Sequence, residues 1–486
     1  MHERGKSDGS VVPTNPPNKA QAAEVGEGRE PAEGNTDSST RPGRSAGSDV
    51  PSGLDRVREV ARRDKDARFT ALLHHVDVSR LRRAYWDIRP KAAAGVDGVT
   101  WGAYGRDLEA NLWDLHQRLH SGAYRARPSR RVYIPKADGR LRPLGIASLE
   151  DKVVQRAVVE VLNAVYEVDF LGFSYGFRPG RGPHDALDAL AVGIKGKKVN
   201  WVLDADIRDF FTSLDSVWLQ KFLEHRIADK RVLRLIQKWL SAGVIENGEW
   251  SETQGTPQGA SVSPLLANVY LHYVFDRWTR HWRRRHARGD MVIVRFADDF
   301  VAGFEHQGDA KQFLRDLRER FARFSLELHP DKTRLIEFGR FAAERRAARG
   351  LGKPETFAFL GFTHISTKTK DGRFMLKRIT ISKRMRAKLR EVKDQLKQRR
   401  HLPVPEQGQW LGSVVRGHLA YYAVPGNSRA IHAFRTQATR HWCAALRQRS
   451  QRHRLTWQRM DRLATRWLPP ARVSHPYPEA RFYAKT

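Results

Sequence analysis

Two adjacent acidic residues, Asp298 and Asp299, interrupt an otherwise apolar stretch from Met291 to Phe304. Two apolar runs around a short polar break are typical of a β-hairpin with the polar residues in its turn. Neighbouring carboxylates in a turn repel each other, and a hairpin does not need them. Because Mg²⁺ prefers a few carboxylate oxygens together with substrate phosphates, the pair is a candidate metal site. A solvated Asp-Asp turn is the alternative for so short a motif.

A second pair of acidic residues lies in the stretch from Val199 to Ile207, which is predicted to be a strand. Side chains alternate between the two faces of a strand, so Asp204 and Asp206 share one face. A carboxylate at the end of this strand, close in space to the turn at Asp298, would complete a metal site that neither segment forms alone.

Residues 130–136 and 141–146 are predicted to form another hairpin, because two β-rich runs flank an Asp-Gly turn. Three basic side chains lie at or beside its tip: Lys136, Arg140 and Arg142. Such a cluster suits a triphosphate, and an ordinary basic surface hairpin is the alternative.

Two loops have compositions suited to ligand contact. Residues 173–180 are dense in aromatic side chains and include Arg178, a mixture that can stack on bases and hold phosphates or can form a packed Gly/Pro loop. Residues 255–261 are rich in Gly and Pro before a predicted helix, which allows close approach to a ligand. Within this loop, Gln258 could hydrogen-bond the edge of a base or sugar.

The charge of the chain indicates a polyanionic partner. Its 486 residues carry a net charge of +33, which self-repels unless nucleic acid or an anionic membrane surface neutralises it. No run of about 18 apolar residues occurs, so no membrane span is expected. The single cysteine, Cys443, excludes a disulfide framework and a multi-cysteine zinc site. We expect a cytoplasmic protein.

The two ends of the chain differ in character. Residues 1–52 carry few large apolar side chains, so we expect a disordered tail. From residue 370 onward, lysine and arginine far outnumber acidic residues, and three amphipathic helices are predicted within 385–396, 410–422 and 431–446. Their basic outer faces are suited to a phosphate backbone. Three basic residues of the first helix are candidate nucleic-acid contacts: Arg384, Lys388 and Lys393.

Helical periodicity is also predicted in the ranges 54–85, 108–119, 151–166, 232–240, 264–278 and 310–324. An apolar strand is predicted at 357–362 and a strand-like stretch at 326–338.

A series of motifs resembles the reverse transcriptase/maturase proteins encoded by bacterial group II introns, over the chain from about residue 60 onward. The motifs occur in the family's order and are GVDGVT (95–100), IPKADGRLRPLGI (134–146), SYGFRPGRGPHDAL (174–187), DADIRDFF (204–211), GTPQGASVSPLLANVYL (255–271), FADD (296–299), LHPDKT (328–333), FLGF (359–362) and GHLAYYAV (417–424). Eight ordered blocks before the last one are far more specific than any one of them.

The resemblance implies an α+β fold of the right-hand polymerase type, with fingers, an antiparallel palm sheet flanked by helices, and an α-helical thumb or maturase X domain. The implied division is a tail at 1–52, fingers at 53–190, palm at 191–369, thumb/X domain at 370–450 and a basic nucleic-acid-binding segment at 451–486. The family's zinc endonuclease is expected to be absent, because its cysteine pairs are missing.

The resemblance also implies an activity, RNA-directed DNA polymerisation, together with binding of the intron RNA, help in its splicing, and intron mobility. Asp206, Asp298 and Asp299 correspond to the catalytic carboxylates, which hold two Mg²⁺ ions, with Mn²⁺ as a substitute. Asp206 rather than Asp204 is the family's first aspartate, because it precedes Ile207 and stands five residues before Phe211.

The remaining site residues follow from the same correspondence. Lys136 and Arg142 would hold the incoming dNTP, Gln258 would contact it, and Phe211 would exclude a ribose 2′-hydroxyl. Arg178 and Lys332 would contact nucleic acid. The implied partners are intron RNA as template, a DNA primer or target, and dNTPs, and the oligomeric state is left open.

Some positions depart from the family pattern. Asp209 and Thr212 stand where Gly and Asp are frequent, and Ala260 replaces a frequent Gly. Two alternatives stay open: a domesticated reverse transcriptase outside an intron, for example in defence, and an RNA-binding splicing factor without polymerase activity.

Overall fold

The computed structural model describes residues 53–135, 141–252, 255, 259–449 and 455–481. The predicted tail, Lys136 and Gln258 lie outside these residues. The described residues combine helices with three sheets, one of them a four-stranded antiparallel sheet, which agrees with the predicted α+β class. No helix in the described ranges is long and apolar enough to cross a membrane.

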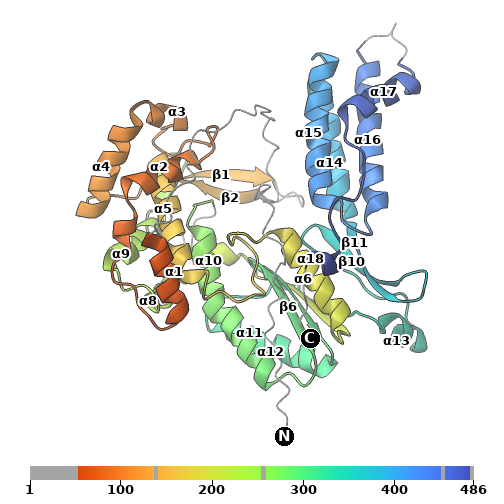
Figure 1. Ribbon diagram of the computed structural model, residues 1–486, viewed down its shortest axis with the longest axis horizontal. Coiled ribbons are helices and arrows are strands. Elements are labelled where there is room, and N and C mark those ends of the chain that lie inside the picture. Colours follow the sequence, from red (N-terminus) through yellow and green to blue (C-terminus); the bar gives the residue numbers. More distant parts are fainter. Residues whose placement is uncertain (1–52, 136–140, 253–254, 256–258, 450–454, 482–486) are drawn as a thin grey trace.

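A four-stranded antiparallel sheet in the order β6-β7-β3-β8 forms the centre of the molecule (Figure 1). Its strands are β3 (Trp201–Asp206), β6 (Met291–Phe296), β7 (Asp299–Phe304) and β8 (Arg334–Glu337). The predicted hairpin around Asp298 is therefore correct. Because strand side chains alternate, Val202 packs with α6 (Pro183–Gly196) on one face and Leu203 packs in the core with α12 (Gln307–Ala322) on the other.

The N-terminal region is helical. Its elements are α1 (Gly53–Arg63), η1 (Leu73–His75), α2 (Val78–Trp86), α3 (Trp101–Tyr104), η2 (Gly105–Asp107), α4 (Leu108–Ser121) and α5 (Leu149–Tyr166). The predicted continuous helical pattern over 54–85 is wrong. The chain leaves α1 where the Asp64 carboxylate accepts the backbone N–H groups of Asp66 and Ala67, and Phe69 then forms a β-bridge with Ile227.

A second sheet has the order β2-β1-β4-β5. Its strands are β1 (Ser129–Pro135), β2 (Leu141–Ile146), β4 (Val244–Glu246) and β5 (Glu249–Ser251). Antiparallel pairing of β1 with β2 confirms the predicted basic hairpin. In Figure 1 this hairpin lies between the N-terminal helices and a group of C-terminal helices.

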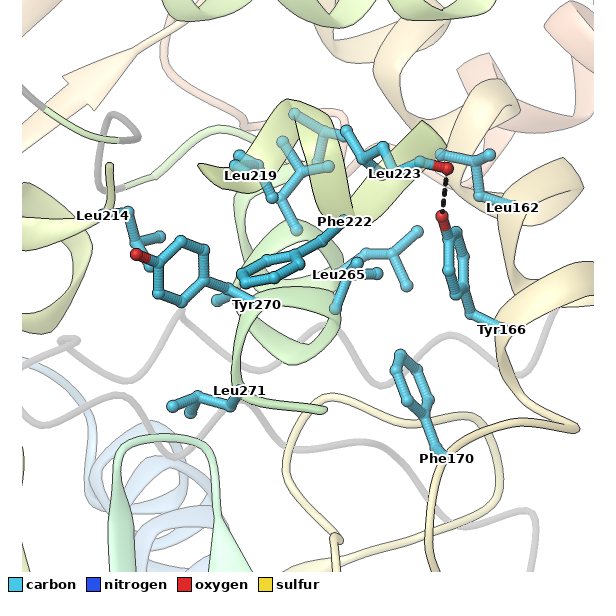
Figure 2. Close-up of a cluster of buried hydrophobic side chains, with 14 of the residues drawn as sticks. Leu162, Tyr166, Phe170, Leu214, Leu219, Phe222, Leu223, Leu265, Tyr270 and Leu271 are labelled. Atoms are coloured by element: carbon cyan, nitrogen blue, oxygen red, sulfur yellow. Dashed lines mark hydrogen bonds between the residues drawn. The ribbon is translucent and has the colours of Figure 1, made fainter. Parts of the chain in front are cut away.

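The main hydrophobic core joins the central sheet to the surrounding helices. The helices between β3 and β6 are α7 (Phe210–Ser213), α8 (Ser216–Glu224), α9 (Lys230–Leu240), α10 (Ser263–Leu271), the π-helical segment His272–Asp276 and α11 (Arg277–Arg285). Figure 2 shows Phe222 and Tyr270 packed together in this core, and the Tyr166 hydroxyl donating to the Leu223 carbonyl at 3.3 Å. The predicted helix at 264–278 therefore continues through a π turn.

A third sheet and a separate helical core follow. The elements are α13 (Ala342–Ala348), β9 (Phe357–Phe359), β10 (Phe362–Lys368), β11 (Phe374–Thr380), α14 (Ser382–Gln398), α15 (Val404–Tyr422), α16 (Ser428–Arg447), α17 (Trp457–Trp467) and α18 (Pro478–Arg481). The three predicted basic helices are present as α14, α15 and α16. Sequence periodicity missed α17, whose Met460 and Ala464 are buried in the same core.

The C-terminal end of the described chain packs against α6, the helix that covers one face of the central sheet. Asp188 on α6 is buried and forms ion pairs with Arg378 of β11 and, at 3.2 Å, with Arg481 of α18. Glu479 of α18 pairs with Lys195 of α6. The described part of 451–486 thus includes a packed helix and a docking segment, where the sequence predicted a basic nucleic-acid-binding segment.

Buried neutral histidines make the fold sensitive to acid. Burial lowers the pKa of His184 to about 2 and the pKa values of His272, His364 and His418 to about 3. The unfolded chain therefore binds more protons than the folded chain below the ordinary histidine pKa near 6.5. The free energy of unfolding should fall as pH drops, by up to ~1.4 kcal/mol per pH unit for each histidine. Urea unfolding between pH 7.5 and 5.5 measures this slope.

His364 offers a control for that slope. Its ring is fully buried and stacks on Phe357 with centroids 4.7 Å apart. His364→Phe should flatten the acid slope by about one histidine's contribution. An unchanged slope would show that His364 does not contribute.

Candidate active site

The central hairpin turns through only two residues. β6 and β7 pair as far as Phe296 opposite Asp299, so Ala297 and Asp298 form the turn. On the other side of β7, Asp299 lies directly opposite Asp206 at the end of β3. The register thus brings together all three carboxylates that the sequence singled out. Asp204 lies opposite Val301, farther from the turn.

The carboxylates share a partly buried, mutually repulsive environment. Burial, followed by the negative charge of Asp206, raises the pKa of Asp298 to about 6. Burial and then the charges of Asp206, Asp204 and Asp298 hold the pKa of Asp299 well above its ordinary range. Three negative charges so close together favour a cation among them.

Lys332 supplies one such cation. Its ammonium forms an ion pair with the Asp206 carboxylate, and the backbone N–H of His329 donates to the Asp206 carbonyl at 2.8 Å. A β-bridge between Ile207 and Leu328 fixes this segment beside β3. Lys332, predicted to contact nucleic acid, lies against a candidate catalytic carboxylate.

The carboxylates are chemically suited to a divalent metal ion. They provide oxygen ligands only, which Mg²⁺ and Mn²⁺ prefer, and a cation would relieve the repulsion that raises the pKa values of Asp298 and Asp299. Within the described residues, no three His, Cys, Asp or Glu side chains are arranged closely enough to hold a metal as they stand.

Two of the predicted nucleotide contacts are described. Arg142 on β2 is near enough to the turn for its positive charge to oppose the rise in the pKa of Asp298. Phe211 lies at the start of α7, partly exposed, and follows Asp209, whose φ of 42° is in the left-handed region that glycine adopts without steric cost. The left-handed backbone at this position explains why glycine is frequent in the family where this chain has Asp209.

Arg178 does not face solvent. Its side chain is 2% exposed, pairs with Glu167, and donates to the carbonyls of Leu171 and Ser174 at 2.8 Å. All of these partners are structural, so the predicted nucleic-acid contact is not supported here. Ser174, Tyr175 and Arg178 of this loop are buried, as the alternative interpretation expected, whereas its Phe177 is exposed.

The three candidate contacts on α14 are partly or fully exposed. Lys388 pairs with Glu391 one turn away at 2.7 Å, and Lys393 is exposed. Arg384 lies against Tyr422 and close to Gly361 in the turn between β9 and β10. The structure therefore places Arg384 where α14 meets the third sheet and the other two along the outer part of the helix.

Two further residues lie near the turn at Asp298: Arg295, which the sequence did not single out, and Phe177, which belongs to the aromatic loop predicted to stack on bases. Arg295 is completely buried in β6, next to the turn. Phe177 is 54% exposed, has a φ of 58°, and its ring lies 6.5 Å from that of Phe296. A lone arginine in the apolar run from Met291 to Phe296 was the available indication for Arg295, because a charge inside a buried strand needs partners.

Carboxylates clustered at the turn of an antiparallel sheet, with basic side chains beside them, define a candidate site for metal-assisted phosphoryl transfer. Comparison with known proteins identifies the class of protein more closely. The family model described as "Reverse transcriptase (RNA-dependent DNA polymerase)" matches residues 134–364.

Protein YkfC of Escherichia coli is 35% identical over 276 residues, which is 50% of this chain and 71% of that protein. The group II intron-encoded protein LtrA of Lactococcus lactis is 35% identical over 224 residues, 45% of this chain but only 37% of LtrA. The mitochondrial nuclear intron maturase 3 of Arabidopsis thaliana is 31% identical over 130 residues, covering 26% of this chain and 18% of that protein.

The chain belongs to the reverse transcriptase family, with group II intron-encoded proteins and intron maturases among its relatives. This confirms the resemblance and the predicted class of enzyme, an RNA-directed DNA polymerase. Enzymes of this family generally use divalent metal ions.

Proposed function

We propose that this chain copies RNA into DNA at the carboxylates Asp206, Asp298 and Asp299. The observation that supports this most directly is the strand register, in which Asp206 lies opposite Asp299 and Asp298 occupies the adjoining turn. Three acidic residues from two distant segments meet beside a basic hairpin, where a triphosphate would need both kinds of charge.

Each residue has a proposed role. Asp206, Asp298 and Asp299 would hold two Mg²⁺ ions, which would supply activation of the primer 3′-hydroxyl and charge neutralisation on the departing pyrophosphate. Arg142 binds the triphosphate in a forked contact. Phe211 packs where a ribose 2′-hydroxyl would lie. Lys136 and Gln258 keep their predicted nucleotide contacts.

We propose a right-hand arrangement of fingers (53–190), palm (191–369) and thumb or X domain (370–450). Supporting this, Figure 1 shows the N-terminal helices and α14–α16 on different sides of the central sheet. The boundary at residue 370 falls between the paired strands β10 and β11, so the third sheet connects palm to thumb. The helical part of the thumb begins at Ser382.

We propose intron RNA as the template and as a splicing substrate, with a DNA primer or target and dNTPs as the other partners. The exposed basic residues of α14 and the similarity to LtrA and to an intron maturase support this proposal. The net charge of +33 favours a long polyanion over a small substrate.

Primer extension on a defined RNA template tests the activity. With Mg²⁺ and dNTPs the purified chain should extend a DNA primer, and a chelator should abolish the reaction, with recovery on adding Mg²⁺ or Mn²⁺. NTPs in place of dNTPs are the matched control and should support little extension. Extension that persists in excess chelator, or absence of extension by a folded protein that binds the template, would overturn the proposed polymerase.

A further inference from the structure

The residue before the candidate catalytic pair has a strained backbone. Ala297 has a φ of 57°, a left-handed conformation that L-residues other than glycine adopt only when their surroundings hold them there. Asp298 follows in the same two-residue turn. The direction of its carboxylate therefore depends on whatever holds Ala297 in this conformation.

Arg295 provides that restraint. Its Nη1 donates to the Ala297 carbonyl at 2.9 Å. Arg295 lies in β6, two residues before Ala297, and is completely shielded from solvent. A hydrogen bond from a buried, fully paired cation to a carbonyl is strong and directional. It locks the peptide between Ala297 and Asp298.

The guanidinium is itself held rigidly from three directions. Nε and Nη2 bond both oxygens of the buried Asp276 at 2.8 and 2.6 Å, Nη1 also reaches Asn268 Oδ1 at 3.1 Å, and Nη2 reaches Ser174 Oγ at 2.7 Å. All five N–H donors of the arginine are thus used. A lysine has three donors and no planar fork, so it cannot make this set.

The partners tie the turn to two separate parts of the fold. Asp276 ends the π-helical segment and Asn268 lies on α10. The backbone of Arg295 also pairs with the loop before α6, accepting from Tyr175 N at 2.9 Å. In that loop a side chain at Gly176 would lie only 2.4 Å from the Ala297 nitrogen, so the loop backbone presses directly against the turn.

We infer that Arg295 is a positioning residue of the polymerase site: through the Ala297 carbonyl it sets the turn that aims Asp298 and Asp299 at the bound metal ions. This rests on the proposed function for its catalytic consequence. Because Arg295 is completely buried and all five of its donors bond protein atoms, its effect on substrate or metal would be indirect, and Asp276 would act by fixing the guanidinium.

The test combines Arg295→Lys with Ala297→Gly. Lysine keeps the charge beside Asp276, so the variant should fold, but it releases the turn. We expect kcat for dTTP on poly(rA) with an oligo(dT) primer to fall roughly 10- to 100-fold, with KM changed less than about threefold. Because glycine adopts positive φ without strain, adding Ala297→Gly should recover at least about fivefold of kcat.

Arg178→Lys is the matched control. Arg178 is also a buried arginine, and its hydrogen-bond partners are Glu167 and the carbonyls of Leu171 and Ser174, none of which belongs to the two-residue turn. Any loss that it causes should not be recovered by Ala297→Gly. Recovery of both lysine variants to the same extent would show that glycine acts non-specifically and would overturn the inference.

Mn²⁺ binding followed by electron paramagnetic resonance gives a readout independent of polymerisation. Arg295→Lys should weaken Mn²⁺ binding about tenfold, and Ala297→Gly should restore it. A wild-type chain that does not extend primers but shows this pattern would refute the proposed function and leave Arg295 as the residue that holds the turn. Unchanged Mn²⁺ binding and kcat in a folded Arg295→Lys protein, or no recovery with glycine, would overturn the inference.

Discussion

Replacing Asp298 and Asp299 together by asparagine should lower RNA-templated primer extension at least about 10³-fold, or ~4 kcal/mol in the barrier. Asparagine has nearly the shape of aspartate but carries no charge, so it cannot hold two divalent ions against their hydration. RNA binding and splicing should persist, because the basic side chains of α14 proposed to bind RNA are unchanged by the substitution. Single-turnover extension, a filter-binding assay and a splicing assay on the intron RNA measure the three properties.

The same double substitution should make the metal-free protein more stable at pH 8. The pKa values of both carboxyl groups are raised in the fold, so ionisation as pH rises through these values disfavours the folded state. Removing both charges should add on the order of 1–2 kcal/mol to the free energy of unfolding, allowing for partial exposure. Thermal unfolding in chelator at pH 8 and at pH 4.5 measures this, and the gain should be smaller at pH 4.5.

Asp114→Asn is the control for both measurements. Asp114 is 64% exposed on α4, where it pairs with Arg118 one turn away, and its loss should change neither extension nor stability appreciably. Two results would contradict the prediction: a double variant that still extends primers, or a splicing loss in a folded variant as severe as the loss of extension. The second would show that one site serves both functions.

Replacing Phe211 by valine should relax the choice between dNTP and NTP by roughly 10- to 100-fold. The aromatic ring would fill the space of the ribose 2′-hydroxyl, and valine leaves that space open. The ring packs at the edge of the main core and lies 5.5 Å from Phe210, so a modest loss of stability is expected as well. Ratios of kcat/KM for dTTP and UTP on poly(rA) measure the selectivity.

The dTTP reaction is the internal control for this variant. If Phe211 acts by excluding the 2′-hydroxyl, kcat/KM for dTTP should change much less than kcat/KM for UTP. Equal losses for both nucleotides would indicate that the ring only shapes the site. Strict dNTP selectivity in the valine variant would assign the exclusion to another residue.

Local sequence properties were sufficient to predict the candidate carboxylates and both hairpins. Apolar residues flank the Asp298–Asp299 pair, and β-rich runs flank the Asp-Gly turn near Arg142. In each case the strands and the turn can be predicted from a short stretch of sequence. The helices α14, α15 and α16 were predictable for the same reason, because the apolar face of a helix is defined by the spacing of residues within one segment.

Other features depended on contacts between distant segments. Whether Asp204 or Asp206 meets the turn is decided by the register of β3 against β7, and a slip of one residue would move every side chain to the opposite face. The burial of Arg178 depends on Glu167, and the contact of Lys332 with Asp206 depends on a bridge to residue 328.

The sequence by itself thus determined which residue types could bind metal and phosphate, and in which hairpins they lie, because turn chemistry and periodicity are local. The family resemblance singled out Asp206, but only the tertiary structure brought it beside Asp298 and Asp299 and showed which arginines face inward. The five bonds of Arg295 come from partners up to 121 residues away, and pairing over such separations is set by the packing of the whole core.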